Sequence, residues 1–74
     1  MEKELKKLYY ESVKKRHFNL SLSRDEQATY FEGMMDACWN LGNMLNLDLS
    51  DWDDIKDKAI QDAKKDYRFY SEIG

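Results

Sequence analysis

The chain of 74 residues contains no proline and only three glycines. This composition gives no sign of a linker or a low-complexity segment, so we expect one domain over residues 1–74. No apolar run reaches the roughly 18 residues that a bilayer span requires. Residues 1–4 are charged where a signal peptide would lead into an apolar stretch. We therefore expect a cytoplasmic protein, of a bacterium or a host cell, with no membrane partner.

Side chains for metal binding and nucleophilic chemistry are equally scarce. Cys38 is the only thiol and His17 the only imidazole, so an internal disulfide is excluded and a zinc site or Cys–His pair would need both. Cys38 falls among apolar residues, where a free cysteine usually packs as a small hydrophobe. No glycine-rich phosphate loop or serine elbow is present. We predict no catalytic activity and no cofactor.

A row of oxygen-bearing side chains raises the question of a hard cation. Glu32, Asp36, Asn40 and Asn43 follow one another at helical spacing and could offer ligands to Mg²⁺ or Ca²⁺. The same row is explained as the wet face of a helix, because hard cations usually gather ligands from a loop or from several elements, and no EF-hand spacing is present. We prefer that explanation and predict no metal site.

Bases are missing from the whole of residues 25–55, although the net charge is only −3. This stretch contains eight acids and neither lysine nor arginine, whereas residues 1–17 contain six bases against three acids. Concentrated charge of one sign speeds association and selects partners more than it adds raw affinity. The pattern predicts a protein partner with a basic surface.

Large apolar side chains are abundant, at 42% of the residues, and they indicate a folded chain. In residues 2–17, Leu5, Leu8, Tyr9 and Val13 recur at the spacing of an amphipathic helix. Residues 18–23 then alternate apolar and polar side chains. So short a stretch without a pairing partner favours a packed connection over a strand.

A second helix is expected at about 24–46, because Ser23 and Glu26 fit a capping box at its start. Its apolar positions occupy well over half of the circumference, so it needs cover on two sides. We expect it at the centre of the molecule, with the other two helices on its flanks.

A third helix is expected at about 51–72, with Ser50 or Asp51 as its N-cap. Asp53 and Asp54 then lie in its first turn, where negative charge is favoured. The predicted fold class is all-α: a small three-helix bundle with a central, widely apolar second helix.

Tyr30 and Trp39 lie at opposite margins of the apolar arc of the second helix. Tyrosine and tryptophan beside carboxylates are typical of binding hot spots. We predict a partner-binding surface on the second helix and the start of the third, formed by Tyr30, Glu32, Asp36, Trp39, Asn40, Asp51, Asp53 and Asp54.

Two alternatives to this protein-binding function stay open. One is a homodimeric structural or regulatory bundle in which a second copy buries the wide apolar arc. The other is a DNA-binding regulator that uses the basic first helix. For a helix-turn-helix, the recognition helix would begin with Asp51, Asp53 and Asp54, which would repel phosphates, so direct nucleic-acid binding is not favoured.

In size, acidity, lack of proline and lack of catalytic motifs, the chain resembles small accessory proteins of phages and mobile elements in Gram-positive bacteria, including anti-CRISPR inhibitors. The resemblance is one of character, since no family motif is present. It implies that an acidic, aromatic surface occupies a basic nucleic-acid-binding groove on a host protein.

Overall fold

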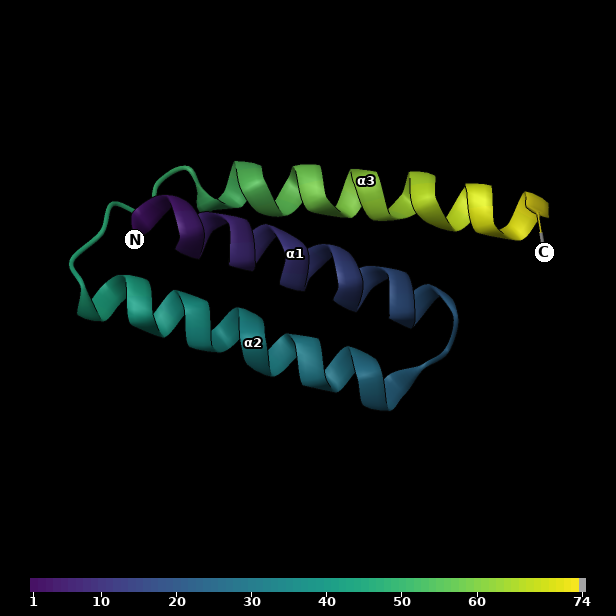
Figure 1. Ribbon diagram of the computed structural model, residues 1–74, viewed down its shortest axis with the longest axis horizontal. Coiled ribbons are helices and arrows are strands. Elements are labelled where there is room, and N and C mark those ends of the chain that lie inside the picture. The colour runs from purple at the N-terminus through teal and green to yellow at the C-terminus, as the bar shows by residue number, and fades with distance from the viewer. Residues whose placement is uncertain (74) are drawn as a thin grey trace.

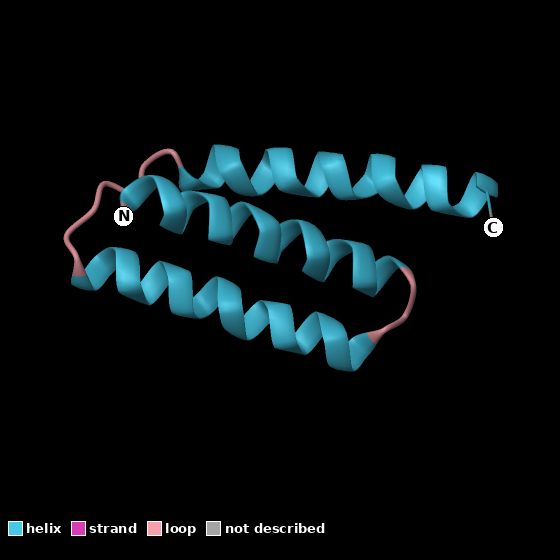
Figure 2. Ribbon diagram, in the orientation of Figure 1, coloured by secondary structure: helices cyan, strands magenta, loops and turns pink. Residues whose placement is uncertain are grey.

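Three α-helices make up the protein in the computed structural model, which describes residues 1–73 (Figures 1 and 2). They are α1 (Glu2–Ser21), α2 (Asp25–Met44) and α3 (Trp52–Ile73). In Figure 1, α1 and α3 run in the same direction, and α2, which follows α1 in the chain, runs antiparallel to both. The predicted all-α three-helix bundle is confirmed. Over the described residues, no helix combines the length and apolar character that a bilayer span needs.

The helix at the centre is α1, and the expectation that the second helix would be central is wrong. In Figure 1, α1 lies between α2 and α3, and it packs against both, while α2 and α3 do not approach each other along their lengths. The buried side chains of α1 include Leu5, Tyr9 and Val13, which face both neighbours. On α2 the buried residues occupy one side only, so the rest of its apolar arc stays exposed.

Trp52, the first residue of α3, is the centre of the core and is completely buried. Its ring lies 4.7 Å from the ring of Tyr9 on α1 and 5.8 Å from that of Trp39 on α2, measured between centroids. Gly42 of α2 packs against the same indole, because a Cβ there would approach Leu49 and Trp52 to 2.9 and 3.4 Å. One side chain therefore joins all three helices.

Small buried residues allow α1 and its neighbours to come close. Ser12 is completely buried in α1, and its hydroxyl donates a hydrogen bond to the carbonyl of Leu8 at 2.7 Å. Ala59 and Ala63, one turn apart on α3, are also completely buried. Because none of these side chains extends beyond a few atoms, the helices pack against α1 with little space between their backbones.

The end of α1 differs from the predicted boundary, since the helix continues through residues 18–21. The apolar and polar alternation in this stretch is accommodated in a helix because Asn19 and Ser21 donate side-chain hydrogen bonds to the carbonyls four residues earlier, at 2.7 and 3.0 Å. Ser23 is not a capping-box residue. Arg24 occupies the N-cap of α2 and makes no side-chain cap hydrogen bond.

Ser23 instead ends α1, in a left-handed backbone conformation with φ of 58°. Its N–H donates to the carbonyl of Leu20 at 3.0 Å, and the N–H of Arg24 donates to the carbonyl of Asn19 at 2.9 Å. These two hydrogen bonds define a Schellman motif, which usually has glycine at the left-handed position. The end of α1 is thus closed by backbone hydrogen bonds.

The end of α2 repeats the same geometry. Asn46 has φ of 56°, its N–H donates to Asn43, and the N–H of Leu47 donates to Gly42, at 3.1 and 3.0 Å. Asparagine is the side chain that tolerates this conformation best after glycine. Helix α2 therefore ends at Met44, two residues before the predicted boundary, and α3 begins and ends within one residue of the expected positions.

Candidate protein-interaction surface

Trp39 is the aromatic centre of the predicted partner-binding residues. Its indole packs edge-on against Trp52 at an interplanar angle of 79°, and 39% of the residue remains exposed. The buried ring beneath it fixes the position of the exposed one. Such a half-exposed indole on a packed base offers a large contact area without much loss of side-chain entropy on binding.

Carboxylates from two helices lie around Tyr9, whose ring packs on Trp52, and one of them, Asp36, precedes Trp39 by about one turn of α2. Burial raises the pKa of the Tyr9 phenol, and the negative charges of Asp53 and Asp36 raise that pKa further, so both acids lie within electrostatic range of one hydroxyl. Asp36 belongs to α2 and Asp53 to the first turn of α3. We call Asp36, Trp39 and Asp53 together the acidic face.

The remaining acids divide into paired and unpaired groups. Arg16 lies 3.9 Å from Glu32, and Lys6 lies 2.8 Å from Asp51, where the hydrogen bond that the ammonium donates to the carboxylate raises the pKa of the lysine. Within residues 1–73, the other six acids of residues 25–55 have no lysine or arginine nitrogen within 4.0 Å, and these are Asp25, Glu26, Asp36, Asp48, Asp53 and Asp54. Much of the predicted negative charge is therefore available to a partner.

Not all eight predicted residues come together. Asn40 follows Asp36 by one turn and shares its side of α2, and Asp54 is exposed beside Asp53. Tyr30 stands nine residues from Trp39, half a turn around the helix, and packs edge-on against Phe31 with centroids 5.2 Å apart. Glu32, Asp36, Trp39 and Asn40 thus share one side of α2, Tyr30 lies on another, and Asp51, Asp53 and Asp54 belong to the loop before α3 and its first turn.

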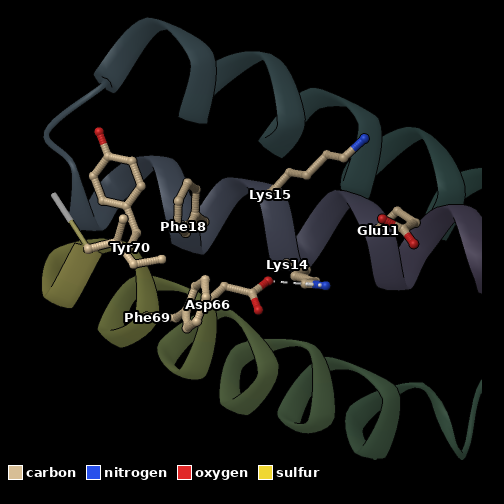
Figure 3. A pocket seen from close by; sticks show the side chains of 8 residues that line it. Glu11, Lys14, Lys15, Phe18, Asp66, Phe69 and Tyr70 are labelled. Atoms are coloured by element: carbon tan, nitrogen blue, oxygen red, sulfur yellow. Dashed lines mark ion pairs between the residues drawn. The ribbon is translucent and has the colours of Figure 1, made fainter.

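A separate groove lies between the C-terminal halves of α1 and α3 and encloses about 530 Å³ (Figure 3). Phe18 and Tyr70 meet edge-on across it at 5.9 Å, and Lys14 pairs with Asp66 at 3.2 Å. The ammonium of Lys15 instead lies 5.8 Å from the ring centroid of Phe31 on α2. The groove is lined by Glu11, Lys14, Lys15, Phe18, Asp66, Phe69, Tyr70 and Ile73.

Comparison with known proteins found no relative of this chain. No family model matches the chain, and neither the curated proteins nor the solved structures include a significant match to it.

Neither the single thiol nor the single imidazole belongs to the acidic face, although Cys38 lies beneath it, near the Tyr9 hydroxyl. Cys38 is buried, and desolvation raises the pKa of its thiol, which keeps it protonated and weakly reactive at neutral pH. Desolvation lowers the pKa of His17, with the charges of Lys64 and Arg16 adding to the effect. Among the described residues, no three histidine, cysteine or acidic side chains converge in a way that could hold a metal ion.

Sequence reasoning missed the groove. Phe18 fell in the segment expected to be a connection, and its place on a helical face was therefore not considered. A signal was available in Phe69, which lies away from the buried side of α3 and is exposed in the structure. Aromatic residues off the core face of two helices that pack side by side indicate a lined groove between them.

Proposed function

We propose that the protein is a non-catalytic binding module whose acidic face engages a basic surface on another protein. The observation that carries the proposal is a half-exposed indole, Trp39, packed on the buried Trp52 and accompanied by carboxylates from two helices. Asp36 and Asp53 have no basic partner within 4.0 Å among residues 1–73. Their charge is free to meet lysine or arginine of a partner.

The chemistry of the face favours arginine. A guanidinium can stack on an indole while it donates hydrogen bonds to a carboxylate, and tryptophan and arginine are enriched among interface hot spots. The carboxylates would also accelerate encounter with a positively charged surface, an effect that salt screens. Binding should therefore weaken as ionic strength rises.

A basic groove that normally holds nucleic acid is the partner surface that best fits this chemistry. Six unpaired acids along residues 25–55 present repeated negative charge, as a phosphate backbone does. Occupation of such a groove would inhibit the nucleic-acid-binding protein without any catalytic step. This is the mode of action implied by the resemblance to phage and mobile-element inhibitors.

The proposal can be tested with a synthetic arginine-rich peptide as the probe and tryptophan fluorescence as the readout. Because Trp52 is completely buried, a change in emission on binding reports mainly on Trp39. We expect the double variant Asp36→Asn with Asp53→Asn to bind about tenfold more weakly at low salt and to depend less on salt than the wild type.

The matched control neutralises Asp25 and Glu26 as Asn and Gln. These acids lie in the first turn of α2, about 15 Å along the helix from Asp36. The control removes the same charge and should lower affinity much less. Equal affinity of the wild type and the Asp36, Asp53 variant at both low and high salt would contradict the proposal. Partners captured from a bacterial lysate can then be tested for loss of nucleic-acid binding.

A further inference from the structure

One side of α2 carries an apolar stripe that is exposed along most of its length, with only Met34 half-buried. Tyr30, Met34, Ala37, Leu41 and Met44 recur at steps of four, three, four and three residues. Tyr30 is 66% exposed, Leu41 40% and Met44 77%. This is the spacing with which helices pair along a common seam. Because α2 contacts α1 on a different side, the stripe is free for a partner.

The stripe lies on one broad face of the molecule, away from the acidic face. Viewed along the axis of α2, Leu41 lies about 100° to one side of the buried Gly42. Trp39, which belongs to the acidic face, lies on the other side of Gly42.

The dimensions of the molecule suit a second copy as the occupant. A compact chain of 8.9 kDa is expected to have an accessible surface of about 4,800 Å², and this protein has 5304 Å². The helices form one layer 43 Å long and 22 Å wide, so the outline of its broad face covers roughly 900 Å², a size comparable with the area of about 800 Å² that each partner buries in a stable dimer. Domains usually contain two packed layers, and here only one is present.

Charge decides which face a second copy would use. The five stripe residues are all uncharged, whereas Asp36 and Asp53 bring unpaired negative charge to the acidic face. Two acidic faces would repel each other, and their carboxylates would lose water without gaining partners. Self-association through the stripe leaves the acidic face of each copy open.

We propose that a second copy of this chain covers the stripe and forms a two-fold dimer with α2 antiparallel to its counterpart. The stripe is nearly symmetrical about Ala37, with Tyr30 and Met44 each seven residues away. An antiparallel pair therefore places Ala37 at the axis, where its small side chain permits close approach, and sets Tyr30 against Met44 of the second copy. The result is a six-helix, two-layer particle.

Light scattering on the eluted protein over a wide concentration range tests this proposal. The wild type should have twice the 8.9 kDa mass of one chain, and the variant Leu41→Glu with Met44→Glu should have the mass of one chain. Both positions are exposed, so the variant should keep its helical circular dichroism spectrum. The control, Asn43→Glu with Gln61→Glu, adds the same charge at exposed polar positions and should remain dimeric.

Cross-linking of the variant Ala37→Cys with a short bis-maleimide tests whether the two-fold axis passes position 37. The control is Ser50→Cys, because position 50 lies in the loop after α2. We expect a cross-linked dimer only with Ala37→Cys. A wild type that is monomeric at every concentration, or stripe variants that remain dimeric, would overturn the proposal. A dimer that cannot be linked through position 37 would overturn the antiparallel arrangement.

Discussion

Trp39 and Trp52 meet edge-on with their ring centroids 5.8 Å apart, and this contact joins the candidate binding surface to the core. The exposed indole is positioned by the buried one, and the buried one is in turn packed on Tyr9 at 4.7 Å. A change at Trp52 should therefore affect both the stability of the fold and the orientation of Trp39. The two effects can be separated by experiment.

We expect Trp52→Ala to lower the free energy of unfolding by about 3–5 kcal/mol, because it removes a fully buried aromatic side chain. That is a large part of the roughly 4–11 kcal/mol typical of a chain of 74 residues. Trp52→Phe should cost less, since it keeps an aromatic ring and removes an indole N–H that has no hydrogen-bond partner within residues 1–73.

Urea unfolding followed by circular dichroism measures these changes, with Trp39→Phe as the control. Trp39 is 39% exposed, so Trp39→Phe should destabilise the fold much less than Trp52→Ala. If Trp52→Ala shifted the free energy of unfolding by less than Trp39→Phe, Trp52 would not be the residue that joins the three helices.

The two Schellman motifs give a second prediction about stability. A left-handed conformation costs an ordinary L-residue about 1–2 kcal/mol, and glycine avoids this cost. We expect Ser23→Gly to raise the free energy of unfolding by up to about 1 kcal/mol. Asn46→Gly should give a smaller gain, because asparagine already tolerates the conformation.

Thermal or urea unfolding of these variants can be compared with that of Ser21→Gly. Ser21 has a helical backbone conformation and its hydroxyl donates to the carbonyl of His17, so Ser21→Gly should lower stability by about 0.5 kcal/mol. Ser23→Gly and Ser21→Gly make the same chemical change two residues apart and should have opposite signs. Destabilisation by both would mean that Ser23 does not adopt the left-handed conformation in solution.

The three helices and their approximate ranges were predictable from the sequence, because apolar periodicity reports which residues of a helix are buried. Which helix lies at the centre was not predictable, because the width of an apolar arc does not say which neighbouring helix covers it. The apolar arc of α2 suggested a central helix, yet part of it remains exposed at Tyr30 and Met44. Small residues gave the missing signal: Ser12 of α1 and Ala59 of α3 are completely buried and allow close approach at α1.

The acidic residues of the candidate surface were also predictable, but their grouping was not. Asp36 and Asp53 are 17 positions apart, and only the packing of α2 and α3 around Tyr9 brings both within range of one hydroxyl. The pairing of Glu32 with Arg16 and of Asp51 with Lys6 depends on the same packing. Sequence alone could count the charges but could not say which of them would be neutralised.

A hydrogen bond between α1 and α3 leads to a prediction about pH. The hydroxyl of Tyr10 donates to the carboxylate of Asp62, which also accepts from Lys58 at 3.0 Å. This hydrogen bond raises the pKa of Tyr10 to about 12 and, with the bond from Lys58, lowers the pKa of Asp62. Each group therefore titrates differently in the folded and unfolded chains, so its contribution to stability depends on pH.

The direction follows from the ordinary pKa values of about 10 for tyrosine and about 3.9 for aspartate. The contribution of Tyr10 is complete below about pH 10 and is lost as the pH rises towards about 12, because the folded protein holds the phenol proton more tightly. The contribution of Asp62 is complete above about pH 4 and is lost as the pH falls through its lowered folded pKa.

Tyr10→Phe keeps the ring and removes the hydrogen bond, so it should remove the alkaline dependence and reduce the acid one, because Lys58 still donates to Asp62. The difference in urea midpoint between the wild type and Tyr10→Phe should be largest near neutral pH and should shrink above about pH 10 and below about pH 4. Comparison of the two proteins at each pH cancels the titration of the other tyrosines and acids. A difference in midpoint that stayed constant from acid to alkaline pH would mean that Tyr10 stabilises the α1–α3 contact by packing alone, without the hydrogen bond to Asp62.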